Sequence, residues 1–185
     1  MLAVAVSVSP MAHAGAPDSK FLYTHITFRA FVLPGVAPMS DTAARPPIVV
    51  SHEGGVRFAA QVRTHRVVVD QPHRGGGSDT APSPIELLAV SLGTCIAYYV
   101  QQFCHARGLP YEGLRVEVDQ EGASSPSRIA KFTARVAIPA DLPPQARALI
   151  ERVVRSCPAH NTLALGAEVA VSIAVGDTEG APAPA

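Results

Sequence analysis

Alternation of apolar and polar residues marks several extended segments of this chain. Residues 56–62 place four apolar side chains on one face, while Arg57 and Arg63 share the opposite side. This pattern predicts a half-buried strand with two arginines on its polar face. Four further segments show similar alternation or a β-branched run: 65–70, 114–121, 129–138 and 168–175. They predict a partner strand, an antiparallel pair and a closing strand.

A long helix is predicted between Pro84 and Arg107. Ser83 is suited to the N-cap position, Pro84 to the first helical position and Glu86 to the third, which together form a capping box. Gly108 supplies the C-terminal stop. The helix would be roughly 36 Å long at about 1.5 Å per residue. Its first half is apolar nearly all round, so we expect a central, buried helix.

A second helix is predicted just before Cys157. Its apolar residues follow helical spacing: Ala146, Leu149, Ile150, Val153 and Val154. Pro158 then favours a short third helix with Cys157 as its N-cap. Without that short helix the order is ββαββαβ, in which the strands are grouped rather than alternating singly with helices. The pattern therefore predicts an α+β fold.

The pattern also sets the expected domain boundaries. We expect one domain over residues 46–176, flanked by a disordered N-terminal extension (1–45) and a disordered Pro/Ala/Gly-rich tail (177–185). A secretory signal would carry a Lys or Arg before its apolar stretch. The apolar start of this extension has none before it, and Pro10 interrupts it. Met39, which opens a polar segment, is an alternative natural start.

Composition narrows the function classes. The 185 residues are 48% hydrophobic, enough for a sizeable core, and 15 basic side chains balance 15 acidic ones. That balance disfavours nucleic-acid or anionic-membrane binding. No apolar run approaches the ~18 residues of a membrane span. Three cysteines are too few for a secreted disulfide framework, so we expect a cytoplasmic protein.

The cysteines carry the most specific chemistry. Cys104 follows Cys95 by nine residues on one helix, about half a turn round and roughly 13 Å along the axis. A disulfide requires Cα atoms within about 7 Å, so these two cannot pair. Cys95 is mid-helix, where a core role and a reactive thiol are equally supported. A reactive thiolate there would need a cation such as Arg57 or Arg63.

Cys157 has a different local setting. As a helix N-cap it would face backbone N–H groups, which favour a thiolate. His160 could add charge or merely cap the turn, since a CxxH spacing is a weak signal for a Cys-His pair. No second close-spaced ligand pair supports zinc, and we expect no metal. Glu86 could orient an arginine or accept a proton, but its place in the capping box favours a structural role.

Three segments, in this order, resemble the OsmC/Ohr family of osmotically inducible and organic-hydroperoxide-resistance proteins. They are GGGSDTAPSPIELLAVSLGTC, FCHARGLPYEGLRVEV and RSCPAHNTL. The likeness runs from about Pro46 to Val175. It implies an OsmC-like α+β fold in which two chains intertwine, with two helices packed within wrapping antiparallel sheets.

The resemblance also implies roles for individual residues. Cys95 matches the peroxidatic cysteine, which is oxidised to sulfenic acid, and Cys157 matches the resolving cysteine. An arginine from an N-terminal strand activates the first sulfur in the family, and Arg57 is the first choice here. In the hydroperoxide-resistance branch a glutamate follows the helix-entry proline; here Ile85 does, and Glu86 is rotated by ~100°. This favours the generic OsmC-like branch.

The resemblance therefore implies a thiol-dependent peroxidase that reduces organic hydroperoxides in oxidative stress defence. The implied partners are a second copy of the chain and a thiol or lipoylated-protein reductant, with no bound cofactor, nucleic acid or membrane. The alternative is a non-catalytic dimer that responds to redox state or binds a hydrophobic ligand.

Overall fold

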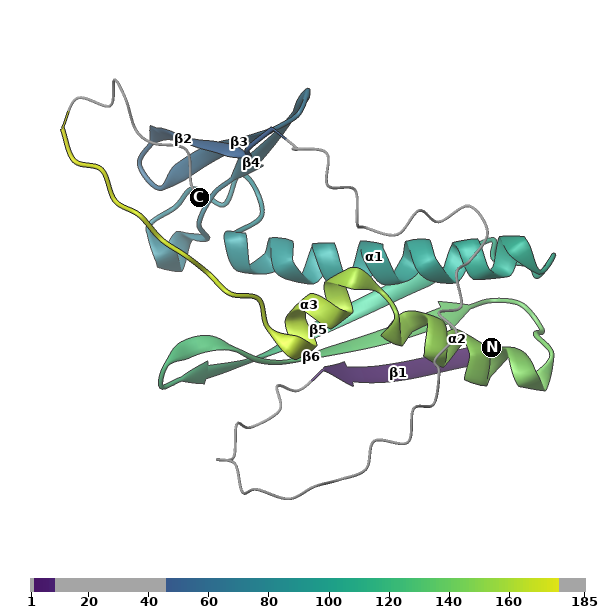
Figure 1. Cartoon of the computed structure of the whole chain (residues 1–185). Helices are drawn as coiled ribbons and strands as arrows, with labels where there is room; N and C mark the ends of the chain where they lie inside the picture. Colours follow the sequence, from purple (N-terminus) through teal and green to yellow (C-terminus); the bar gives the residue numbers. More distant parts are fainter. Residues whose placement is uncertain (1, 9–45, 177–185) are drawn as a thin grey trace, which may run out of the picture.

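The computed structural model describes residues 2–8 and 46–176 and consists of two antiparallel sheets and three α-helices (Figure 1). The larger sheet has the order β1 (Leu2–Val8), β6 (Ser127–Ile138) and β5 (Arg115–Ser124). The smaller sheet has the order β2 (Val49–Gly54), β3 (Arg57–Val62) and β4 (His65–Val69). The helices are α1 (Pro84–Ala106), α2 (Pro144–Arg155) and α3 (Pro158–Leu165). A short 3-10 turn, His73–Gly75, precedes α1.

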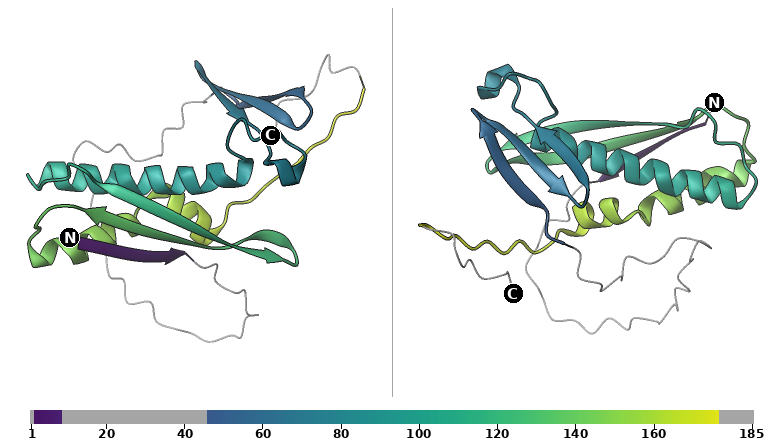
Figure 2. Two further views of the ribbon diagram at one scale, coloured as in Figure 1. Left: turned by 180° about the vertical axis from the view of Figure 1, so that it is seen from behind. Right: turned by 90° about the horizontal axis from the view of Figure 1, so that it is seen from above.

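The three helices cover one face of the larger sheet (Figures 1 and 2). α1 contacts β5 and β6, whereas α2 and α3 contact β1 and pack beside α1. Alternate residues of β6 face the helices and are buried: Phe132, Ala134, Val136 and Ile138. The outer face carries ion pairs, including Arg135 with Asp119 and Lys131 with Glu121. The expected α+β class is therefore confirmed.

The start of α1 follows the predicted local chemistry. The Ser83 backbone N–H donates to Glu86 Oε2 at 2.7 Å, and the Glu86 N–H donates to Ser83 Oγ at 3.4 Å. Both halves of the capping box are thus present, with proline at the first helical position. Within the helix, a Cβ on Gly93 would lie 3.1 Å from Val118 Cγ2. Glycine therefore lets α1 approach β5 closely.

The expected organisation of the chain needs two corrections. Leu2–Val8 form β1, which pairs with the centre of the larger sheet, although residues 1–45 were expected to be disordered. The rest of that extension and the tail 177–185 lie outside the described residues. The first strand of the smaller sheet, β2, was also missed. Its side chains are all exposed, so burial imposes no clear apolar alternation.

The expected closing strand at 168–175 is wrong for this single chain. The segment is extended but pairs with no strand among the described residues. Its apolar side chains are between 78 and 96% exposed: Val169, Val171, Ile173 and Val175. Alternation predicts strand conformation, but a strand also needs a sheet edge to bond with.

The outer face of α1 differs from the expectation of a fully buried helix. Its inner face is buried in the core, as predicted, through Leu92, Ile96, Val100 and Phe103. Four large apolar side chains of α1 are exposed nonetheless: Ile85 and Leu88 in its first two turns, and Val90 and Tyr98 on the side away from the core. Contrary to the sequence expectation, α1 is also long and apolar enough to cross a membrane, the one such helix among the described residues. The core helix of a soluble protein can be equally long and apolar, so these properties are weak support for a membrane segment.

Candidate active site

Tertiary packing brings Cys95 and Cys157 together. Cys95 lies in the middle of α1 and is half-buried, while Cys157 is the N-cap of α3 and is 0% exposed. α1 and α3 pack against each other, and the Cys95 side chain lies close enough to raise the pKa of the Cys157 thiol. Both thiols are free. The site thus consists of one solvent-accessible sulfur backed by a buried one.

The electrostatics of Cys157 reverse the local expectation. Burial, assisted by the interaction with Cys95, raises the pKa of the Cys157 thiol to about 12. The amides of His160 and Ala159 at the start of α3 act in the opposite direction but are outweighed. The predicted N-cap is confirmed, but the predicted thiolate is wrong, because desolvation exceeds the effect of the helix end. Cys157 is a thiol at neutral pH.

Cys104 is separate from this pair, as its spacing predicted. It is fully buried in the core on the far side of α1, and burial raises the pKa of its thiol. A buried, protonated thiol is chemically inert and behaves as a small apolar side chain. Cys104 therefore serves packing rather than the site.

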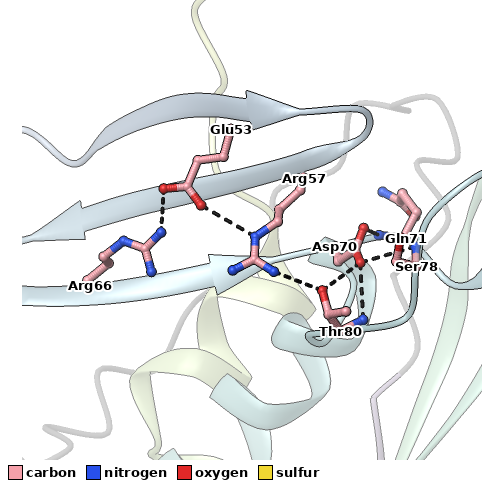
Figure 3. A network of polar contacts seen from close by, with 7 residues as sticks. All are labelled: Glu53, Arg57, Arg66, Asp70, Gln71, Ser78 and Thr80. Atoms are coloured by element: carbon pink, nitrogen blue, oxygen red, sulfur yellow. Dashed lines mark hydrogen bonds and ion pairs between the residues drawn. The ribbon is translucent and has the colours of Figure 1, made fainter.

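Arg57 belongs to a polar network at the junction of the smaller sheet and α1 (Figure 3). Its Nη1 donates to Thr80 Oγ1 at 3.0 Å, and its Nε lies 3.4 Å from Glu53 Oε2. Glu53 also pairs with Arg66, and the hydrogen bond from Arg66 is the main cause that lowers the pKa of Glu53. Among the described residues, Arg57 is thus held by Glu53 and Thr80, not by either sulfur.

Asp70 organises the loop that carries Thr80. It is 2% exposed, and its Oδ2 accepts from the Thr80 hydroxyl at 2.9 Å and the Thr80 N–H at 3.1 Å. Further N–H groups donate from Gln71 at 2.8 Å and Ser78 at 3.2 Å. These bonds, those from Thr80 first, lower the pKa of Asp70. A buried carboxylate with four donors therefore fixes the loop between β4 and α1.

Gly77 allows this loop to close, and its replacement gives a stability prediction. A Cβ at Gly77 would lie 1.8 Å from the Gln71 carbonyl oxygen and 2.8 Å from Asp70 Oδ1. We expect Gly77→Ala to lower the free energy of unfolding by about 1–3 kcal/mol, because backbone must move. Thermal unfolding followed by circular dichroism measures the loss. Gly122→Ala is the control, since its Cβ would meet nothing closer than 4.0 Å; equal melting temperatures would contradict the prediction.

The remaining sequence candidates lie away from the sulfurs. Glu86 Oε2 accepts from both the N–H and the hydroxyl of Ser83, each at 2.7 Å, and these bonds lower the pKa of Glu86. Glu86 therefore has the structural role that the capping box predicted. Arg63 lies in the turn between β3 and β4 with a φ of 55°. In residues 46–176 it forms no hydrogen bond with either cysteine, so of the two arginines only Arg57 is anchored towards α1.

Several residues of the site region escaped the sequence prediction. Tyr99 lies one turn after Cys95, and the charges of Cys95 and Cys157 both act on its hydroxyl. The spacing of four residues on a predicted helix could have indicated this neighbour. Glu53, Asp70 and Thr80 carried no comparable signal, because their contacts depend on how the loop folds. No group of three or more His, Cys, Asp or Glu in residues 2–8 and 46–176 could hold a metal ion.

Comparisons with known proteins agree with this architecture. The sequence profile of the OsmC-like protein family matches residues 75–172. A proposed osmotic-stress-induced and detoxification-response protein from Psychrobacter arcticus 273-4 is 21% identical, with a TM-score of 0.57 over 62% of this chain and 85% of that chain. An OsmC-like protein from Mycoplasma pneumoniae is 17% identical, with a TM-score of 0.53 over 65% of this chain and 88% of that chain. No curated protein shows a significant match.

These similarities differ in what they establish. At such identities the solved structures show the shared fold alone, while the family profile covers more than half of the chain, including α1 with Cys95 and α3 with Cys157. The chain belongs to the family of OsmC-like proteins.

Proposed function

We propose that this protein is a cysteine-based peroxidase that reduces organic hydroperoxides. The observation that carries the proposal is the contact between a half-buried Cys95 and a buried Cys157. Two free thiols that meet across two helices can be oxidised to a disulfide without a metal or organic cofactor. The association of the family with hydroperoxide resistance supports the same chemistry.

The two sulfurs differ in access to solvent, and this difference supports the order of the steps. The Cys95 thiolate attacks one peroxide oxygen; the O–O bond breaks, an S–O bond forms, and the departing alkoxide takes a proton to become an alcohol. The Cys157 sulfur then attacks the Cys95 sulfenic acid and forms the disulfide. The displaced hydroxide takes the Cys157 proton and leaves as water. An external dithiol, such as a dihydrolipoyl group, reduces the resulting disulfide.

Arg57 is our candidate for the cation that favours the Cys95 thiolate. Three observations support this assignment. Arg57 lies on β3, its partners Glu53 and Thr80 hold it in place, and Thr80 belongs to the loop that connects the smaller sheet to α1. In this role the guanidinium must exchange Thr80 for a sulfur of its own chain or of a second chain. A guanidinium beside a thiolate would lower the pKa of that thiol.

The direct test of the function is consumption of cumene hydroperoxide in the presence of dithiothreitol or dihydrolipoamide. We expect turnover proportional to protein concentration, and a Cys95–Cys157 disulfide when peroxide is added without reductant. The second candidate, a redox-responsive or ligand-binding dimer, is favoured by the exposed apolar face of α1. It predicts stoichiometric disulfide formation or ligand binding but no turnover.

We also propose that the protein acts as a homodimer in the cytoplasm. OsmC-like proteins are commonly dimeric. In this chain α1 exposes four large apolar side chains, and segment 168–175 has no partner strand among the described residues. A second chain could cover the apolar side chains of α1 and pair with segment 168–175.

A charge at an exposed apolar position of α1 tests the dimer. We expect Leu88→Glu to raise the dimer dissociation constant at least tenfold, because a carboxylate would have to be buried at the interface. Size-exclusion chromatography with light scattering across a concentration series measures the change. Gln120→Glu, at an exposed position of β5, is the matched control. A wild-type protein that is monomeric at every concentration would contradict the proposal.

A further inference from the structure

Tyr99 lies beside both cysteines of the site, although its hydroxyl has no role in the chemistry described so far. It follows Cys95 by four residues on α1, so the two side chains share one face of the helix, with about 5–6 Å between their Cβ atoms. Both are half-buried and pack against the same core. The Tyr98 ring packs edge-on against the Tyr99 ring, with centroids 5.7 Å apart and planes at 80°. These contacts fix the position of the ring.

The surroundings keep the Tyr99 hydroxyl protonated and near the sulfurs. Burial raises the pKa of Tyr99, and the charges of Cys95 and then of Cys157 act in the same direction. The hydroxyl therefore lies within electrostatic reach of both thiols and remains a hydrogen-bond donor at neutral pH. No hydrogen bond joins it to another residue in the described ranges, and the side chain is not fully buried. It is thus available to a molecule that approaches Cys95.

The other polar candidates for this step are already engaged. Arg57 donates to Thr80, Glu86 caps α1, and His160 Nδ1 lies 3.3 Å from Asn161 Oδ1. The Cys157 proton is required later, when the sulfenic acid is resolved. Attack on a hydroperoxide produces an alkoxide, which is a strong base and needs a proton as it departs. Tyr99 is a hydroxyl donor on the same face of α1 as the attacking sulfur.

We propose that Tyr99 is a catalytic residue of the peroxidase reaction proposed above, on which this inference rests. Its hydroxyl donates a hydrogen bond to the peroxide oxygen that carries the organic group, as the Cys95 sulfur attacks the other oxygen. When the O–O bond breaks, the electron pair stays on the departing oxygen, which takes the Tyr99 proton and leaves as an alcohol. The tyrosinate regains a proton from water, so the group is restored in each cycle.

The experiment compares Tyr99→Phe with Tyr98→Phe. Each change removes one hydroxyl and keeps the ring, and the two tyrosines are adjacent on α1. We expect Tyr99→Phe to slow oxidation of Cys95 by cumene hydroperoxide about 100-fold, the size of one general-acid contribution, and Tyr98→Phe to leave it within about twofold. The rate is measured in a single turnover, by loss of the free thiol after rapid mixing.

Alkylation of Cys95 by iodoacetamide at the same pH separates proton donation from other effects. This reaction uses the same thiolate but releases iodide, which needs no proton, so we expect equal rates for both variants and the wild type. Equal loss of alkylation and peroxide reaction in Tyr99→Phe would overturn the inference, because it would place the effect on the sulfur or the packing. A peroxide rate equal to that of Tyr98→Phe would also overturn it. If the wild-type protein itself fails to react with hydroperoxide, the proposed function fails together with this inference.

Discussion

Replacement of Cys95 by serine is expected to abolish hydroperoxide consumption. A serine hydroxyl is not ionised at neutral pH and cannot form the sulfenic acid, so both steps of the cycle are lost. We expect kcat/KM for cumene hydroperoxide to fall at least about 1000-fold, to the rate of the reductant alone. The assay follows residual peroxide at fixed dithiothreitol or dihydrolipoamide.

Cys104→Ala is the matched control for this variant. It removes a thiol from the same helix but from the fully buried side, where the thiol has only a packing role. We expect its peroxidase activity to match that of the wild type, with at most a lower melting temperature from the small cavity. Equal consumption by wild-type protein and Cys95→Ser would refute the enzymatic proposal. Loss of activity in Cys104→Ala alone would show that Cys104, not Cys95, is the reactive sulfur.

Replacement of Cys157 by serine is expected to stop the cycle after its first step. Cys157 is the sulfur in contact with Cys95, so without it the sulfenic acid has no resolving thiol. Without reductant, each chain would reduce one peroxide, and excess peroxide would then convert Cys95 to sulfinic acid, which thiols do not reverse. Sustained turnover with dihydrolipoamide would decline to a plateau.

Intact-protein mass spectrometry distinguishes the outcomes for this variant. After peroxide treatment, the wild type should lose the mass of two hydrogen atoms as the disulfide forms. Cys157→Ser should instead gain two oxygen atoms on a peptide that contains Cys95. Cys104→Ala should behave like the wild type, because its resolving pair is intact. A Cys95–Cys104 disulfide in any variant would show that the helix geometry does not hold in solution.

The local signals of the sequence predicted the elements that are stabilised locally. The Ser83–Glu86 capping box and Pro84 define the start of α1, and the structure contains both hydrogen bonds of that box. Pro158 likewise predicted Cys157 as the N-cap of α3. Such groups interact within one turn of chain, so their spacing carries the information.

Elements that depend on distant partners were predicted less well. The segment 168–175 alternates like a strand but has no sheet edge among the described residues, while Leu2–Val8 join the larger sheet through pairing with β6. The Asp70 loop also depends on a compact arrangement: its carboxylate accepts from residues up to ten positions away. A residue pattern indicates which secondary structure a segment favours, but it does not indicate which other segment lies close enough to pair with it.

The chain by itself determined the α+β class, the positions of α1, α2 and α3, and the exclusion of a Cys95–Cys104 pair, because these follow from caps, periodicity and helix rise. The pairing of Cys95 with Cys157 came from family resemblance, and only the packing of α1 against α3 placed the sulfurs in contact. Tertiary structure alone also decided the protonation of Cys157. Desolvation depends on every neighbour that excludes water, and this cost exceeds the effect of a helix N-terminus that the sequence could indicate.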